Sequence, residues 1–226
     1  MSAVLRAEGL SRTFTSAGGD VVAVREAELA VEPGELVVIA GRSGAGKTTL
    51  LMMLGGLDRP TAGRVLVDGV DLADPKTDVA ALRGSRIASI FQTAGLIPVL
   101  SAAENVEVPL RIRRTEPAER DRRVADALRD VGLEDHARQR PGELSGGQQQ
   151  RVGIARALVM SPGILLADEP TAQLDSETGG QIMELIARLV HDRGTAAVVA
   201  THDAAMFARA DRVLELHDGV LRRREG

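Results

Sequence analysis

The apolar residues of this chain fall into short, uninterrupted runs rich in alanine, valine, isoleucine and leucine. The four clearest runs are ELVVIA (35–40), RIASIF (86–91), GILLA (163–167) and TAAVVA (195–200). Runs of this length without polar alternation are typical of strands that are buried on both faces of a parallel sheet. Segments with helical spacing follow two of the runs, at 49–57 and 176–194. The pattern therefore predicts an α/β core.

The first part of the chain has a different pattern, in which short β-like runs are separated by turn residues. Such runs occupy 4–10 and 21–31, and the residues between them at 17–20 favour a turn. A further short strand is predicted at 64–69, and RVLELHDGVL at 212–221 predicts a terminal hairpin. We therefore expect an antiparallel β subdomain beside the core.

Between about residues 101 and 160 the strand patterns stop. Ser101 opens a capping box with Glu104 ahead of the run AENVEVPL. Pro117 begins a charged amphipathic helix that Gly132 closes. Because strands occur on both sides of this part, we expect a helical lobe inserted into the α/β core.

Composition excludes several classes of protein. The chain has 226 residues, of which 44% are hydrophobic and 27% charged, which suits one ordinary globular domain. Its net charge of −4 lacks the basic excess typical of nucleic-acid binding, and the absence of cysteine excludes disulfide scaffolds and thiolate metal sites. We expect neither a signal peptide nor a membrane span, because no apolar run approaches roughly 18 residues.

GRSGAGKT, at 41–48, matches the phosphate-loop pattern of glycine, four residues and Gly-Lys-Thr. The motif lies between a predicted buried strand and a predicted helix, as phosphate binding requires. Lys47 would contact the β- and γ-phosphates, and the Thr48 hydroxyl would hold Mg²⁺. A plain glycine-rich turn accounts poorly for this lysine, since the only other lysine is Lys76. The nucleotide-binding residues expected here are Gly41, Arg42, Ser43, Gly44, Ala45, Gly46, Lys47, Thr48 and Thr49.

Two adjacent acids end the apolar run ILLADEP. A buried strand that ends in Asp168 and Glu169 is costly unless these carboxylates bind something. Asp168 suits a contact with Mg²⁺ through water, and Glu169 could polarise an attacking water. A pair of solvated carboxylates at a strand end is the alternative, which the phosphate loop makes the weaker one.

The stretch LSGGQ, at 144–148, predicts a second anion site. Ser145 is a good N-cap for the helical pattern that follows, and Gly146 and Gly147 leave the backbone N–H groups uncovered. Exposed N–H groups at a helix start suit an anion. The stretch therefore indicates half of a phosphate site.

With these motifs together, the chain resembles the ATP-binding subunit of an ABC transporter over nearly its whole length. LSGGQ resembles the signature motif of that family, and Gln92 resembles the Q-loop glutamine. The resemblance implies that Gln92 contacts Mg²⁺ and takes part in the reaction. Asp175 in AQLD resembles the D-loop residue, and His202 in ATHD the switch histidine. Phe14 stands where the family carries an aromatic ring that stacks on adenine.

The resemblance implies a phosphate-loop NTPase core of the RecA-like type with an N-terminal antiparallel β subdomain and an inserted helical lobe. One domain of 1–226 is expected, with the core and β subdomain at about 1–92 and 161–226 and the lobe at about 93–160. Catalysis is expected from Glu169, His202, Lys47 and Gln92, and the metal contacts from Thr48, Gln92 and Asp168.

The resemblance also implies a head-to-tail dimer, in which each ATP lies between one subunit's phosphate loop and the other's signature. Ser145, Gly147 and Gln148 would then grip the γ-phosphate of the nucleotide held by the partner. The three other histidines carry no such signal and are interpreted as structural: His136, His191 and His217.

Two longer stretches, at 91–110 and 168–186, resemble the bacterial subfamily of lipoprotein-releasing, macrolide-exporting and cell-division ATPases. The resemblance implies a permease partner with a large extracytoplasmic domain, and a location at the cytoplasmic face of the inner membrane. The chain departs from the subfamily at Gln173, where asparagine is usual. We expect the permease to dock in a groove beside Gln92, with Leu96 as a contact.

Two other classes of protein are alternatives. A soluble ABC ATPase that acts on nucleic acid or ribosomes is the alternative function, but such proteins carry two ATPase units or long coiled-coil insertions. A GTPase switch needs an Asn-Lys-x-Asp motif, and the only asparagine, Asn105, is followed by valine. ATP is therefore the expected nucleotide.

Overall fold

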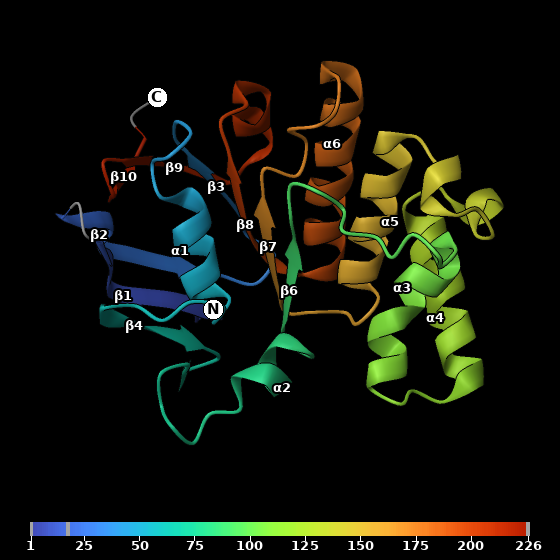
Figure 1. Cartoon of the computed structure of the whole chain (residues 1–226), viewed down its shortest axis with the longest axis horizontal. Coiled ribbons are helices and arrows are strands. Elements are labelled where there is room, and N and C mark those ends of the chain that lie inside the picture. Colours follow the sequence, from blue (N-terminus) through green and yellow to red (C-terminus); the bar gives the residue numbers. More distant parts are fainter. Residues whose placement is uncertain (1, 17–18, 225–226) are drawn as a thin grey trace.

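The computed structural model describes residues 2–16 and 19–224, and the strands of these residues form a ten-stranded sheet (Figure 1). The strand order is β5-β4-β1-β2-β10-β9-β3-β8-β7-β6. Part of the predicted turn at 17–20, residues 17 and 18, lies outside the described residues. The strands are β1 (Leu5–Ser16), β2 (Gly19–Val31), β3 (Leu36–Ala40), β4 (Ala62–Val67), β5 (Val70–Asp71), β6 (Ile87–Ile90), β7 (Ile164–Asp168), β8 (Ala196–Thr201), β9 (Arg212–His217) and β10 (Val220–Arg223).

One end of the sheet is parallel, as the uninterrupted apolar runs predict. β3 pairs with β8, β8 with β7 and β7 with β6, all in parallel. Every residue of β3 and β8 is buried, because other elements cover both faces of the sheet. Successive side chains point to opposite faces, so Leu36 and Val38 join one core cluster while Val37 and Ile39 join the other.

The antiparallel part of the sheet lies at the other end. β1 pairs with β2 on one side and with β4 on the other, and β5 extends β4. A parallel pair between Val220 of β10 and Arg25 of β2 connects this part to the core. Buried residues of the first helix, Leu50 and Leu54 among them, belong to the same cluster as those of β1, β3 and β8. This helix therefore packs against both parts of the sheet.

The remaining long helices cover the opposite face and the far edge (Figure 1). α5 and α6 lie side by side, and α3 and α4 pack beyond them, away from β1. Their buried residues form the second core cluster, together with one face of the parallel strands. The expected fold class, an α/β core with an antiparallel β subdomain and an inserted helical lobe, is confirmed. The helices are α1 (Lys47–Leu54), α2 (Val79–Arg83), α3 (Ala102–Ile112), α4 (Pro117–Asp130), α5 (Gly146–Leu158) and α6 (Ser176–Arg193), and the 3₁₀ turns are η1 (Glu134–His136), η2 (Pro141–Glu143) and η3 (Ala204–Arg209).

Local sequence signals account for most helix ends. The Ser101 hydroxyl accepts the N–H of Glu104, whose carboxylate accepts the N–H of Ser101, so the predicted capping box is present. Pro117 is the first residue of α4, as predicted. α1, in contrast, begins two residues before the predicted segment, because Gly46 turns the chain directly into the helix with φ of 100°. The short elements α2 and β5 were not predicted.

None of the helices in the described residues is both long enough and apolar enough to span a membrane.

Candidate functional site

The phosphate loop runs from the end of β3 to the start of α1. The Lys47 ammonium group lies inside this loop, where it donates to the carbonyl oxygens of Gly41 (2.7 Å) and Arg42 (3.2 Å). Its side chain is only 6% exposed. The lysine is thus held in a fixed direction by backbone of its own loop.

Two glycines of the loop are required by close packing. A Cβ atom at Gly46 would lie 2.2 Å from the carbonyl oxygen of Ala23 in β2, and one at Gly41 would lie 2.6 Å from that of Leu216 in β9. Gly44 has φ of 82° but open space around it. The first two positions therefore seat the loop against neighbouring strands, whereas Gly44 leaves room for a ligand to approach the backbone.

Thr48 and Asp168 meet across the sheet edge. The Thr48 hydroxyl donates to Asp168 Oδ2 at 2.7 Å. The other oxygen, Asp168 Oδ1, is buried and has no hydrogen-bond partner within the part of the chain that the structure describes. An unpartnered buried carboxylate oxygen is costly, so this atom is suited to a ligand.

The Glu169 carboxylate lies between the Lys47 ammonium group and the imidazole ring of His202. Its carboxylate is 3.2 Å from the Lys47 ammonium and 3.0 Å from His202 Nδ1. Burial alone would raise the pKa of Glu169, but the hydrogen bonds and charges of His202 and Lys47 outweigh it, so the pKa lies below its usual value. The backbone here is left-handed, with φ of 45°, and is held by a bond from the Glu169 N–H to the carbonyl oxygen of Ala200. The residue is therefore an ionised base in a constrained position.

A cavity of about 340 Å³ brings most of the predicted residues together at the carboxyl ends of β3, β7 and β8. This is the sheet edge at which α/β proteins bind ligands. Gln92, which follows β6, also reaches the cavity. Two small residues that sequence reasoning missed, Ala23 and Ala172, complete its wall. The predicted site residues that line it are Ser43, Gly44, Gly46, Lys47, Thr48, Thr49, Gln92, Asp168, Glu169 and His202.

The LSGGQ stretch does not line this cavity. Ser145 is the N-cap of α5, as predicted: its hydroxyl accepts the Gln148 N–H, and Gln148 Oε1 accepts the Ser145 N–H. No hydrogen bond within the described residues uses the N–H groups of Gly146 and Gly147. A Cβ atom at Gly147 would lie 2.5 Å from the Thr178 side chain, whereas Gly146 has more space. Gly147 thus permits close packing of α5 on α6.

Asp175 and Phe14 also lie outside the cavity lining. Asp175 caps α6, and hydrogen bonds from the backbone of Thr178 and Glu177 lower its pKa. Phe14 on β1 is 41% exposed, and the Arg12 guanidinium lies 4.5 Å from its ring centroid.

The loop after β6 is fastened to α5, which sequence reasoning missed. Arg156 donates to the carbonyl oxygens of Ala94 and Gly95, at 2.5 and 2.9 Å, and burial lowers its pKa. One turn earlier, a Cβ atom at Gly153 would lie 3.3 Å from the Ala94 side chain. These residues share a face of α5, so the helix that begins at LSGGQ also holds the loop that carries Gln92.

His136 contacts the LSGGQ stretch in the folded chain. Its Nδ1 lies 2.7 Å from Gln139 Oε1, and its Nε2 lies 3.3 Å from the side-chain nitrogen of Gln148. The sequence indicates a structural role for this histidine because it does not lie at the carboxyl end of a predicted strand. Its contact with the LSGGQ stretch spans 12 residues and exists only in the fold.

The chain is similar to known proteins in sequence and in fold. The model of the ABC transporter family matches residues 24–172. The protein YtrE of Bacillus subtilis, named as an ABC transporter ATP-binding protein, is 46% identical over 90% of this chain and 88% of its own length.

Two further relatives belong to the transport systems that the sequence resembles. The lipoprotein-releasing system ATP-binding protein LolD of Chromohalobacter salexigens is 43% identical over 96% of this chain and 92% of its own length. The macrolide export ATP-binding/permease protein MacB of Rhodopseudomonas palustris is 46% identical over 94% of this chain. The chain spans only 33% of that longer protein.

A solved structure shares the fold. The dimeric ATP-binding cassette MJ0796, in a post-hydrolysis state bound to ADP and Pi, superimposes with a TM-score of 0.87 at 38% identity. The match covers 98% of this chain and 99% of that chain.

Proposed function

Because the chain belongs to the ABC transporter family, we propose that its cavity binds ATP and hydrolyses it to drive a membrane permease. The observation that carries this proposal is the convergence of Lys47, Thr48, Asp168, Glu169 and His202 on one cavity. A phosphate loop supplies the cation and the backbone N–H groups, and the carboxylates supply a metal contact and a base. The chain is thus an ATPase subunit of an ABC transporter.

In this proposal Lys47 first binds the phosphates, and Glu169 then acts on the attacking water. Without nucleotide, the Lys47 ammonium is neutralised by Glu169 at 3.2 Å. The β- and γ-phosphates replace this carboxylate as the anionic partner of Lys47, which frees Glu169 to accept a proton from the attacking water. His202, 3.0 Å from Glu169, holds the carboxylate in place.

The residues present also fit Mg²⁺. This cation binds proteins through one or two carboxylates and completes its coordination with phosphate oxygens and water. Among the described residues no cluster of three or more His, Cys, Asp or Glu side chains could hold a metal alone, which is compatible with such a shared site. Thr48 and the unpartnered oxygen of Asp168 would hold the cation, and Gln92 lines the same cavity. When bound, Mg²⁺ neutralises charge on the phosphates.

The metal site predicts the behaviour of Asp168→Asn. This change keeps the side chain's size and its bond to Thr48 but removes the charge. We expect the Mg²⁺ concentration for half-maximal ATP hydrolysis to rise at least about tenfold. A magnesium titration of ATPase activity measures this, and Asp74→Asn, in an exposed turn, is the matched control. An unchanged Mg²⁺ requirement would exclude Asp168 from the site.

Two copies of the chain assemble head to tail, with ATP as the shared ligand. The LSGGQ stretch does not line the chain's own cavity, yet it presents the uncovered N–H groups of Gly146 and Gly147 at a helix start. A partner's γ-phosphate satisfies these groups, and the Ser145 hydroxyl still has its proton to donate. The relative MJ0796 is dimeric in its ADP- and Pi-bound structure.

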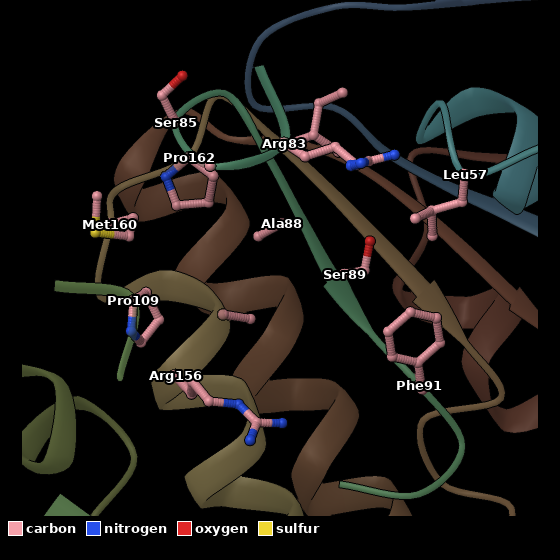
Figure 2. A pocket seen from close by; sticks show the side chains of 13 residues that line it. Leu57, Arg83, Ser85, Ala88, Ser89, Phe91, Pro109, Arg156, Met160 and Pro162 are labelled. Atoms are coloured by element: carbon pink, nitrogen blue, oxygen red, sulfur yellow. The ribbon is translucent and has the colours of Figure 1, made fainter. Parts of the chain in front are cut away.

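A groove along β6 is the proposed docking site for the permease (Figure 2). β6 is the edge strand of the sheet, and the groove of about 300 Å³ runs between the core and the lobe. Figure 2 shows Leu57 and Phe91 at one end of the groove and Met160 with Pro109 at the other. Leu57 and Phe91 are each 48% exposed. An exposed apolar groove of this kind suits a short helix of a partner protein.

Arg156 connects this groove to the proposed dimer interface. It lines the groove and binds the backbone of Ala94 and Gly95 after Gln92. Because α5 begins at LSGGQ, movement of a docked permease helix is transmitted along α5 to the signature. We place the chain at the cytoplasmic face of the inner membrane, held by a permease with a large extracytoplasmic domain, as in export or mechanical transmission.

The docking groove is tested by Leu57→Asp. Leu57 is a better probe than the sequence-based choice, Leu96, because Leu96 packs against the core and a charge there would disturb the lobe. A charge at Leu57 should abolish co-purification with the permease and its stimulation of ATP hydrolysis, while leaving the activity of the isolated subunit within about twofold. Val70→Asp, equally exposed on β5 at 45%, is the control. Normal permease binding by the Leu57 variant would count against the groove.

A further inference from the structure

The side chain of Gln148 is committed to two contacts inside its own subunit. Its Oε1 accepts the N–H of Ser145 at 2.8 Å, and its Nε2 lies 3.3 Å from His136 Nε2. The ring of His136 makes a second contact, from Nδ1 to Gln139 Oε1 at 2.7 Å. A row of three polar side chains therefore runs from the first turn of α5 back to η1.

Hydrogen-bond chemistry allows one consistent arrangement of protons in this row. The Ser145 N–H can only donate, so the Gln148 carbonyl oxygen faces it and the Gln148 NH₂ group faces His136. His136 Nε2 must then accept, which places the ring proton on Nδ1, where Gln139 Oε1 accepts it. With a neutral imidazole at His136, every donor in this row of three side chains faces an acceptor. Reversal of the Gln148 amide would set NH₂ against N–H at Ser145 and remove the donor from His136.

The backbone around His136 is anchored well enough to hold the ring in place. The His136 N–H donates to the carbonyl oxygen of Leu133, which is buried. The next residues bind the start of α3, since the carbonyl oxygens of Ala137 and Gln139 accept the N–H groups of Ala103 and Ala102. His136 itself is half-buried. The ring is thus a rigid support for Gln148.

We propose that His136 is a positioning residue for the LSGGQ stretch. By fixing the Gln148 amide, it keeps the capping box closed and the N–H groups of Gly146 and Gly147 directed away from their own subunit. These groups then meet the partner's γ-phosphate already oriented, and less ordering is needed when the dimer forms. The inference rests on the proposed ATP-bound dimer.

The test uses the full chain with Glu169→Gln, which should accumulate as an ATP-bound dimer. In this background, His136→Ala should raise the protein concentration for half-dimerisation in ATP and Mg²⁺ about tenfold. The reason is that the LSGGQ stretch of each subunit loses a hydrogen bond that orients it for the partner's phosphate. His136→Gln offers an acceptor oxygen near the position of Nε2 and should restore dimerisation to within about twofold. His191→Ala should have no effect, because His191 contacts Asp211 and both lie far from His136 in the sequence.

The readouts separate a positioning role from a structural one. Sedimentation velocity gives the dimerisation constant, thermal unfolding gives the stability, and a fluorescent ATP analogue gives the affinity of the monomer for nucleotide. The proposal expects weaker dimerisation at unchanged nucleotide affinity, with rescue by glutamine. It is overturned if His136→Ala dimerises like its parent, or if alanine and glutamine weaken dimerisation equally. Should His136→Ala fail to fold, Gln139→Leu tests the same row by removing the acceptor of Nδ1, and an unchanged constant for that variant also overturns the proposal.

Failure of the dimer model itself gives a different result. In that case the Glu169→Gln parent stays monomeric in ATP, before any change at His136 is made. If the Glu169→Gln parent dimerises and the His136 variants dimerise equally well, the role of His136 is refuted but the dimer model is not.

Discussion

Lys47→Ala is expected to lower the rate of ATP hydrolysis at least about a hundredfold, or about 3 kcal/mol in the barrier. The ammonium group is oriented by the carbonyl oxygens of Gly41 and Arg42, and Lys47 lines the cavity that we propose binds the phosphates. No other lysine or arginine lines the cavity among the described residues, so nothing replaces the lost charge. A steady-state ATPase assay of the purified subunit measures the loss.

Two further variants test whether the loss of activity is due to the ammonium group of Lys47. Lys76→Ala removes the chain's only other lysine, from an exposed loop, and should keep the parental rate. Lys47→Arg keeps the charge but places a planar fork where a compact ammonium group fits between two carbonyls, so it should also be nearly inactive. If Lys47→Ala hydrolysed ATP at close to the parental rate, the phosphate-loop assignment would be wrong.

Glu169→Gln should convert the subunit into a stable dimer in ATP and Mg²⁺ and leave it monomeric in ADP. Glutamine keeps the shape of the side chain but cannot accept a proton, which should cost on the order of a hundredfold or more in hydrolysis. Lys47, Thr48 and Asp168 should still bind ATP, and the partner's LSGGQ stretch should still close on the γ-phosphate. Size-exclusion chromatography with light scattering distinguishes monomer from dimer.

Ser145→Arg in the same chain should return it to monomer, because the larger side chain blocks the seat of the partner's phosphate. The change also removes an N-cap, which costs about 1 kcal/mol of stability. Ser101→Arg is the matched control, since Ser101 caps α3 with the same capping box and lies outside LSGGQ. A Glu169→Gln protein that binds ATP tightly yet remains monomeric would contradict the role of LSGGQ in the dimer.

The sequence by itself determined the features that depend on neighbours along the chain. Uninterrupted apolar runs indicated the buried parallel strands, because a strand covered on both faces has no polar side to show. Helix starts at Ser101, Pro117 and Ser145 were predictable because capping uses residues within one turn. The phosphate loop is likewise a continuous motif, and the resemblance to ABC ATPases, shown by the family match, followed from it and LSGGQ.

Only the tertiary structure decided which side chains share a partner across long separations. It placed Glu169 against both Lys47 and His202, 122 and 33 residues away, by aligning the ends of three strands. It also required glycine at Gly46 because β2 passes within contact distance, and it set Arg156 on the backbone after Gln92. His136 carries no local signal, since its role depends on the folding of η1 against α5. Such contacts arise from packing between distant segments, which neither residue spacing nor periodicity records.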